Sequence, residues 1–251
     1  MTNSPENIEY ATPAIEAFYR NHRVRWEQFY ESERAILGEL GLNADSSVLD
    51  IGCGCGGLGL ALRERFGVVN YTGVEINRQA AATAREMNPA GSFLCTDILK
   101  LSPRELPEES RDVVISLSCI DWNLRFADML ARAYRYVRPG GCLVASLRLT
   151  PGESLNDPRR SYQYINFDGK REGEVAPYVV LNFRELMSDI SALAPAGIRA
   201  VGYWGTPSPT AVTPLARVVF CVAAIRKGSA PEQGCVRQLD LPPELMDASG
   251  A

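Results

Sequence analysis

A run of glycines and the carboxylates around it are the residues of this sequence that most clearly indicate ligand chemistry. Four glycines stand within Gly52–Gly57, directly after the apolar run Ser47–Ile51. Glycines let the backbone turn tightly and approach a ligand where a Cβ would collide. The spacing also fits Gly-x-Gly-x-x-Gly, the dinucleotide fingerprint, and Glu75 follows at about the distance of a ribose-binding acid. The run therefore predicts a site for a nucleotide-like cofactor.

Asp50 distinguishes between the cofactors that such a loop can hold. It ends the strand before the glycines, where the pyrophosphate of a dinucleotide would pack, and its carboxylate would repel phosphate charges. A ligand with an ammonium or sulfonium group would be attracted instead. S-adenosylmethionine carries both cations and no phosphate, so Asp50 favours it, either by direct contact or by orienting loop amides or water.

Alternating strands and helices must position these residues. The segment 71–77 reads as a strand that presents Glu75 at its carboxyl end, where a carboxylate can accept hydrogen bonds from both ribose hydroxyls. The segment 92–97 reads as a third strand that ends in Asp97, suited to accept from an adenine amino group. The apolar run 112–118 is typical of a strand buried between helices.

The chain resembles the class I S-adenosylmethionine-dependent methyltransferases over roughly residues 45 to 150. Five pieces carry the resemblance, in order and at plausible spacing: Val48-Leu-Asp-Ile-Gly-Cys-Gly54, Gly73-Val-Glu-Ile-Asn77, Cys95-Thr-Asp97, Ser116-Leu-Ser118 and Val137-Arg-Pro-Gly-Gly141. The resemblance implies a Rossmann-like α/β fold. Its sheet would have seven mostly parallel strands, with an antiparallel seventh strand and helices on both faces.

The resemblance also implies a role for each residue of the cofactor site. The backbone around Gly52, Cys53 and Gly54, beside Asp50, would hold the methionine part of the cofactor. The other expected contacts are Glu75 on the ribose, Ile76 against the adenine, Asp97 and Ile98 at its polar edge, and Leu117 and Ser118 near the amino group. The product would be S-adenosylhomocysteine.

The acceptor side of the site is predicted less directly. Methyl transfer needs alignment of the acceptor and exclusion of water, and a general base when the acceptor is a hydroxyl or an ammonium. Asp121 and His22, the one histidine, are the candidate catalytic residues. The candidate substrate-binding residues are Tyr19, Trp122, Asn123, Tyr162 and Tyr164.

Two segments outside the core are expected to contribute to the acceptor site. Residues 1–42 read as a helical cap in which Tyr10, Phe18, Tyr19 and Trp26 either pack on the core or cover the site. Residues 150–181 form an insertion after the fifth strand that either lines a substrate pocket or remains a surface hairpin. The remaining domain expectations are a methyltransferase domain over 43–228 and a flexible tail over 229–251.

The acceptor is predicted to be an oxygen or nitrogen of a small molecule. The segment Ser118-Cys-Ile-Asp121 departs from the Asn/Asp-Pro-Pro-Tyr pattern of many enzymes that methylate nucleic-acid bases or glutamine, and the net charge is −4. The alternatives are an RNA or protein methyltransferase guided by the basic loop 159–171, and a non-catalytic cofactor-binding module. Binding through nucleic-acid phosphates would weaken steeply with salt.

Composition agrees with a cytoplasmic enzyme. The 251 residues are 46% hydrophobic, enough for one α/β core, and no run is long enough to span a membrane. The seven cysteines are odd in number and stand mostly in apolar strands, as in reduced proteins. Cys53 and Cys55 have no second cysteine or histidine pair beside them, so we expect no metal site. Because no apolar run is long enough to span a membrane, we also expect no membrane partner.

Overall fold

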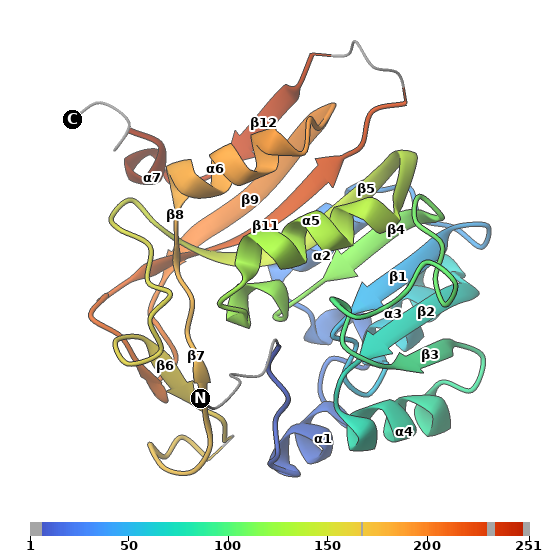
Figure 1. Ribbon diagram of the computed structural model, residues 1–251, viewed down its shortest axis with the longest axis horizontal. Coiled ribbons are helices and arrows are strands. Elements are labelled where there is room, and N and C mark those ends of the chain that lie inside the picture. Colours follow the sequence, from blue (N-terminus) through green and yellow to red (C-terminus); the bar gives the residue numbers. More distant parts are fainter. Residues whose placement is uncertain (1–6, 167, 230–233, 248–251) are drawn as a thin grey trace.

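The computed structural model describes residues 7–166, 168–229 and 234–247. Its centre is a sheet in the strand order β12-β9-β11-β5-β4-β1-β2-β3 (Figure 1). The strands are β1 (Ser47–Ile51), β2 (Asn70–Glu75), β3 (Ser92–Cys95), β4 (Arg111–Ser116), β5 (Val137–Thr150), β9 (Gly197–Gly205), β11 (Val218–Arg226) and β12 (Val236–Asp240), and the short β8 (Leu181–Asn182) pairs with β5. Only β11 runs antiparallel to its neighbours, β5 and β9, along this path. The expected mostly parallel sheet with one inserted antiparallel strand is confirmed, but within the described residues β8 and β12 extend it from the expected seven strands to nine.

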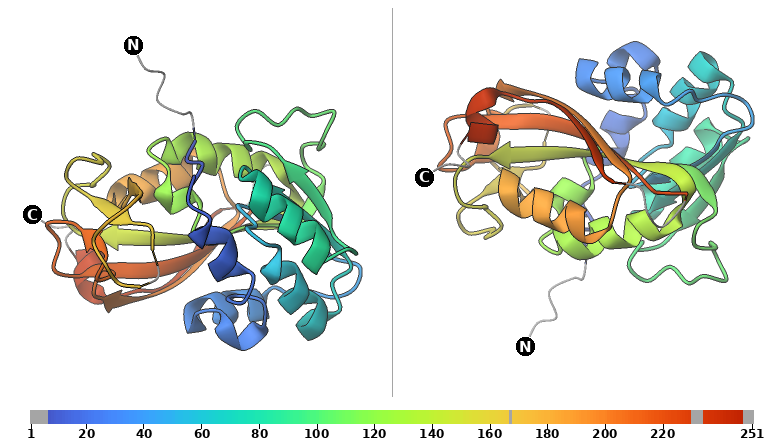
Figure 2. Two further views of the ribbon diagram at one scale, coloured as in Figure 1. Left: turned by 90° about the horizontal axis from the view of Figure 1, so that it is seen from below. Right: turned by 90° about the horizontal axis from the view of Figure 1, so that it is seen from above.

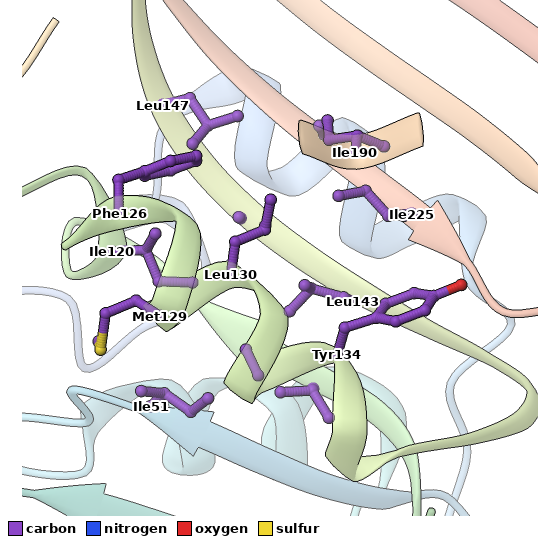
Figure 3. Close-up of a cluster of buried hydrophobic side chains, with 14 of the residues drawn as sticks. Ile51, Ile120, Phe126, Met129, Leu130, Tyr134, Leu143, Leu147, Ile190 and Ile225 are labelled. Atoms are coloured by element: carbon purple, nitrogen blue, oxygen red, sulfur yellow. The ribbon is translucent and has the colours of Figure 1, made fainter. Parts of the chain in front are cut away.

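Helices cover both faces of the sheet. One face packs against α2 (Glu31–Glu39) and α3 (Gly57–Phe66), and the other against α5 (Phe126–Tyr136) and α6 (Phe183–Ala192). In α5 the buried residues Phe126, Met129, Leu130 and Tyr134 recur every three or four positions and face the strands (Figure 3). The helix α4 (Arg78–Met87) lies against β2 and β3.

The C-terminal segment differs from the expected flexible tail. Its described part forms β12, which pairs with β9 in parallel, and α7 (Pro243–Asp247), whose Leu245 is buried with Leu241 in the main core. Residues 230–233 and 248–251 lie outside the described residues. Most β12 side chains are exposed, so backbone hydrogen bonds rather than a hydrophobic pattern hold this strand, and composition alone does not predict it.

The cap and the insertion meet below the sheet. The cap contains α1 (Ala14–Tyr19) and the 3-10 turn η1 (Trp26–Gln28), and the insertion contributes β6 (Tyr162–Tyr164) and β7 (Val175–Pro177) to a small second sheet with β10 (Ala211–Val212). The segment before α1 runs between β6–β7 and α4 (Figures 1 and 2). Glu174 fixes it there by accepting hydrogen bonds from the backbone N–H groups of Ala11 (2.9 Å) and Thr12 (2.8 Å).

Candidate functional site

A cavity of about 220 Å³ lies at the carboxyl ends of β1 to β4. All the residues expected to bind the cofactor line it: Asp50, Gly52, Cys53, Gly54, Glu75, Ile76, Asp97, Ile98, Leu117 and Ser118. They come from four strand ends far apart in sequence, because parallel strands bring their carboxyl ends to one edge of a sheet. The fold therefore gathers the predicted cofactor residues around one cavity.

The glycine loop has the geometry that requires glycine. Gly52 has a φ of +73°, and a Cβ there would lie 2.5 Å from Cys119 Sγ. Its backbone N–H donates to the carbonyl of Val74 (2.8 Å), which fixes the turn to β2. At the start of α3, a Cβ on Gly57 would collide with the carbonyl oxygen of Arg23. The loop thus packs tightly against both the cap and the segment after β4.

Glu75 is held between the glycine loop and the end of β2. Its Oε2 accepts from the backbone N–H of Gly54 (2.9 Å) and its Oε1 from that of Asn77 (2.8 Å). Burial raises the pKa of this carboxyl, and these backbone hydrogen bonds oppose that rise. Each oxygen keeps a further lone pair, so the carboxylate can still accept hydrogen bonds from two ligand hydroxyls.

Asp50 lies buried at the floor of the cavity. Its side chain is hydrogen bonded to the hydroxyl of Tyr71, which donates to Oδ2 at 2.5 Å. Burial raises the pKa of Asp50 to about 7, while the Tyr71 hydrogen bond and the Arg23 charge lower it. A cationic ligand would favour the charged form of this carboxyl.

Asp97 connects the cavity to the N-terminal segment. Its Oδ1 accepts from the side chain of Asn7 (3.0 Å) and from the backbone N–H of Leu99 (2.9 Å). Asn7 in turn accepts from the side chain of Asn123 at 2.6 Å. Residues about 90 positions apart are joined here, a contact that no sequence spacing could indicate.

The expected acceptor-side residues divide into two groups. His22, Tyr19, Trp122 and Tyr164 line the cavity. Tyr162 does not, and its ring packs edge-on against Tyr164 at 5.7 Å. Asn123 lies behind the wall, buried and bonded to Asn7, so it acts on the site through the N-terminal segment.

His22 has one ring nitrogen engaged by the protein. Its Nδ1 lies 2.9 Å from the carbonyl oxygen of Phe18, and its ring stacks on the Phe18 ring at 4.0 Å. A carbonyl can only accept, so Nδ1 carries the hydrogen in this bond. The neutral ring then keeps its lone pair on Nε2, the form that a general base requires.

The structure corrects the expected position of Asp121. This residue is buried outside the cavity lining, and its Oδ2 lies 3.2 Å from Nε of Arg148. The Arg148 guanidinium also donates to the Asp121 carbonyl and lies over the rings of Trp122 (4.3 Å) and Tyr178 (4.0 Å). The turn after β4 directs Asp121 towards β5, so it holds Trp122 in place and does not face an acceptor.

Several cavity-lining residues were not predicted as binding residues. They come from the N-terminal segment, the strand ends and the insertion: Asn7, Ile8, Tyr10, Ile15, Asn77, Cys119, Gln163, Ile165 and Asn166. Tyr10 was expected as a possible covering residue, and Gln163, Ile165 and Asn166 belong to the insertion that was expected either to line a substrate pocket or to remain a surface hairpin. The insertion reaches the cavity through the segment Gln163–Asn166, in line with one of the two expectations for it.

The basic loop is mostly engaged with the protein itself. Arg159 pairs with Asp157 (2.9 Å), Lys170 with Asp168 (3.2 Å), and Arg171 donates to backbone carbonyls of the β10 region. Within the part of the chain that the structure describes, no three His, Cys, Asp or Glu residues are grouped to hold a metal, and no helix is long and apolar enough to cross a membrane.

The strand order, the glycine loop after β1 and the acid after β2 define a Rossmann-like methyltransferase fold. Residues 48–141 match a family model described as a methyltransferase domain. The chain is 29% identical over 123 residues to trans-aconitate 2-methyltransferase of Paracidovorax citrulli, a match that covers 47% of this chain and 46% of that protein. It is 23% identical over 201 residues to the protein of that name from Delftia acidovorans, a match that covers 77% of this chain and 72% of that protein.

A solved structure shows the same fold. It is phosphoethanolamine N-methyltransferase 2 of Haemonchus contortus in complex with S-adenosyl-L-methionine, with a TM-score of 0.59 and 16% identity over 86% of this chain and 56% of that one. The present chain therefore spans about half the length of the Haemonchus chain and of the Paracidovorax protein. Residues 48–141 are thus similar to a methyltransferase domain, and the fold is that of S-adenosylmethionine-dependent methyltransferases.

Proposed function

We propose that this protein binds S-adenosylmethionine and transfers its methyl group to an oxygen or nitrogen of a small molecule. The observation that supports this most is Glu75, which both braces the glycine loop and keeps lone pairs free for ribose hydroxyls. Asp50 adds a buried carboxylate that suits a cationic cofactor. The acceptor would enter between the N-terminal segment, Trp122 and the insertion.

The residues of the chain then have defined tasks. The acceptor atom forms a bond to the methyl carbon while the electron pair of the methyl–sulfur bond stays on sulfur, which leaves neutral S-adenosylhomocysteine. A hydroxyl or ammonium acceptor also releases a proton. His22 lines the cavity, and because its Nδ1 carries the hydrogen towards the Phe18 carbonyl, the unprotonated Nε2 of the neutral ring is the atom that would receive that proton. The cap and the insertion exclude water from the reaction.

Calorimetry with S-adenosylmethionine tests the proposed cofactor site. Replacing Glu75 by Ala should weaken binding by about 1.5–3 kcal/mol, because charge-assisted hydrogen bonds are lost. Glu64→Gln, which alters an exposed carboxylate on the neighbouring α3, is the control and should bind as the wild type does. If the wild-type protein binds no S-adenosylmethionine, the proposal is wrong.

A screen of metabolites with a methyl-labelled donor tests the activity itself. Label should pass to a small molecule and S-adenosylhomocysteine should accumulate in equal amount. His22→Gln should lower kcat by about 10²-fold or more, the usual contribution of a general base, with little change in cofactor affinity. Equal kcat values for the two proteins would remove His22 from the mechanism.

A further inference from the structure

Part of the cavity lining is an apolar, aromatic wall. It is contributed by the N-terminal segment, the turn after β4 and the insertion, through Ile8, Tyr10, Ile15, Trp122, Tyr164 and Ile165. Such a wall binds flat or apolar groups by burying their surface and by ring contacts. Gln163 and Asn166 add amide groups that can bind a hydroxyl or carbonyl.

The cations around this wall are already neutralised. Among the described residues that line the cavity, Arg23 is the only Lys or Arg. Its Nη2 lies 2.8 Å from Oε1 of Glu33, whose side chain is 1% exposed. If the Arg23 guanidinium left Glu33 to pair with an anionic ligand, the Glu33 carboxylate would stay buried without a partner, which is strongly unfavourable.

The next cation, Arg148, is equally committed. It lies behind Trp122, is 3% exposed, and is paired with the buried Asp121. His22 is exposed, so solvent would screen any charge on it. The residues outside the described part of the chain include no Lys, Arg or His.

The remaining charges of the cavity are negative. Asp50, Glu75 and Asp97 all line it, and together they favour a cationic cofactor over an anionic acceptor. A polycarboxylate or a phosphate ester would find neither a free cation nor an attractive field. A neutral ring compound would lose none of these interactions.

We infer that the acceptor is an uncharged small molecule with an aromatic or similarly apolar ring that carries a hydroxyl or amino group. This inference rests on the proposed methyl transfer. In the reaction the ring hydroxyl or amine would bond to the methyl carbon, the methyl–sulfur electron pair would remain on sulfur, and the acceptor proton would leave to His22 or water. The substrate class thus differs from the tricarboxylate and phosphate compounds named for the relatives above.

Two probes of similar size that differ chiefly in charge test the inference. The protein loaded with S-adenosylhomocysteine is titrated in a calorimeter with 3,4-dihydroxybenzyl alcohol and with 3,4-dihydroxybenzoate. The neutral probe should bind at least about tenfold more tightly, since the carboxylate gains no charge-assisted partner in the wild-type cavity. Equal or tighter binding of the benzoate, or binding of neither probe, overturns the inference.

Variants that supply a cation sharpen this test. Glu33→Gln frees the charge of Arg23 and should selectively improve binding of the benzoate. Glu31→Gln, the same change at an exposed position of the same helix, should leave the ratio of the two affinities unchanged. If Glu33→Gln does not fold, Gln163→Arg places a cation on the insertion and should have the same effect. An unchanged ratio in the folded variant contradicts the inference.

Failure of the inference and failure of the proposed function give different results. Turnover of trans-aconitate or phosphoethanolamine by the wild-type protein would overturn the neutral acceptor and leave methyl transfer standing. Absence of binding by both S-adenosylmethionine and S-adenosylhomocysteine would overturn the proposed function and this inference with it.

Discussion

Among single residues, Asp50 is expected to favour binding of a cationic cofactor while its ionisation lowers the stability of the folded protein. Its pKa is raised to about 7 by burial, well above that of an aspartate in an unfolded chain. The folded protein therefore binds more protons than the unfolded chain between about pH 4 and pH 7. Through this group, stability is greatest below pH 4 and falls as the pH rises through 7.

The Asp50→Asn variant should separate the two effects. Because the amide never ionises, the variant should be more stable than the wild type at pH 8, by up to about 1.4 kcal/mol for each unit of pKa shift. It should also bind S-adenosylmethionine more weakly, since it lacks the charge that faces the cation. Urea unfolding at pH 5 and pH 8, with calorimetry at pH 8, measures both. A stability difference that does not change with pH would contradict this account.

Site residues at the ends of strands could be predicted from the sequence, whereas those brought in by long-range contacts could not. Asp50, Glu75 and Asp97 are found from sequence because each ends a strand, and strand ends meet at one edge of the sheet. Asn7 is not found, because it reaches the cavity only through contacts across long stretches of chain, and Gln163 is found only as part of the insertion that was expected either to line a pocket or to remain a surface hairpin. Asp121 was misplaced because its sequence position does not tell towards which neighbour the turn directs it.

At the scale of elements, Arg148 joins β5 to the 3-10 turn η2 (Ile120–Trp122) that follows β4. Its guanidinium lies over the rings of both Trp122 and Tyr178, so it fixes the face that Trp122 shows to the cavity. The buried pair with Asp121 makes this link costly to break from one side only.

Arg148→Met should therefore lower stability by about 3–5 kcal/mol, because Asp121 is left buried with an unpaired charge. Adding Asp121→Asn should recover part of this loss, which an ordinary pair of independent sites would not do. In the folded double variant kcat should fall while affinity for S-adenosylmethionine stays near that of the wild type. Thermal unfolding of all four proteins measures the coupling, and strictly additive losses would argue against the link.

The elements that the sequence predicts well are those whose buried residues form a recognisable pattern along the chain. The helices α3 to α6 show a buried helical stripe, and the strands β4 and β11 contain a continuous apolar run. The cap differs, since Arg23 adopts a φ of +60° and breaks the expected helical region into α1, η1 and α2. The close packing of the Arg23 carbonyl against Gly57 and the ion pair of Arg23 with Glu33 outweigh the local helix preference there.

At the scale of the whole molecule, the C-terminal segment completes the core at the edge opposite β3. Leu241 and Leu245 are buried in the same cluster as β5, β9 and α6, and Gly202 leaves room for the Leu241 side chain. The exposed β12 covers the hydrogen-bonding edge of β9, which would otherwise be open to pairing with other chains. None of its described residues lines the cavity.

This separation predicts a variant that loses stability and keeps its site. Leu245→Ala should lower the free energy of unfolding by about 2–4 kcal/mol, the usual result of removing a buried leucine side chain. Val236→Ala, in the same segment but 72% exposed, should change it by less than about 0.5 kcal/mol. Both folded variants should bind S-adenosylmethionine as the wild type does, because the strand ends that form its site are held by β1, β2 and β4. A Leu245→Ala protein as stable as the wild type would mean that the core ends at β9 and that the tail only rests upon it.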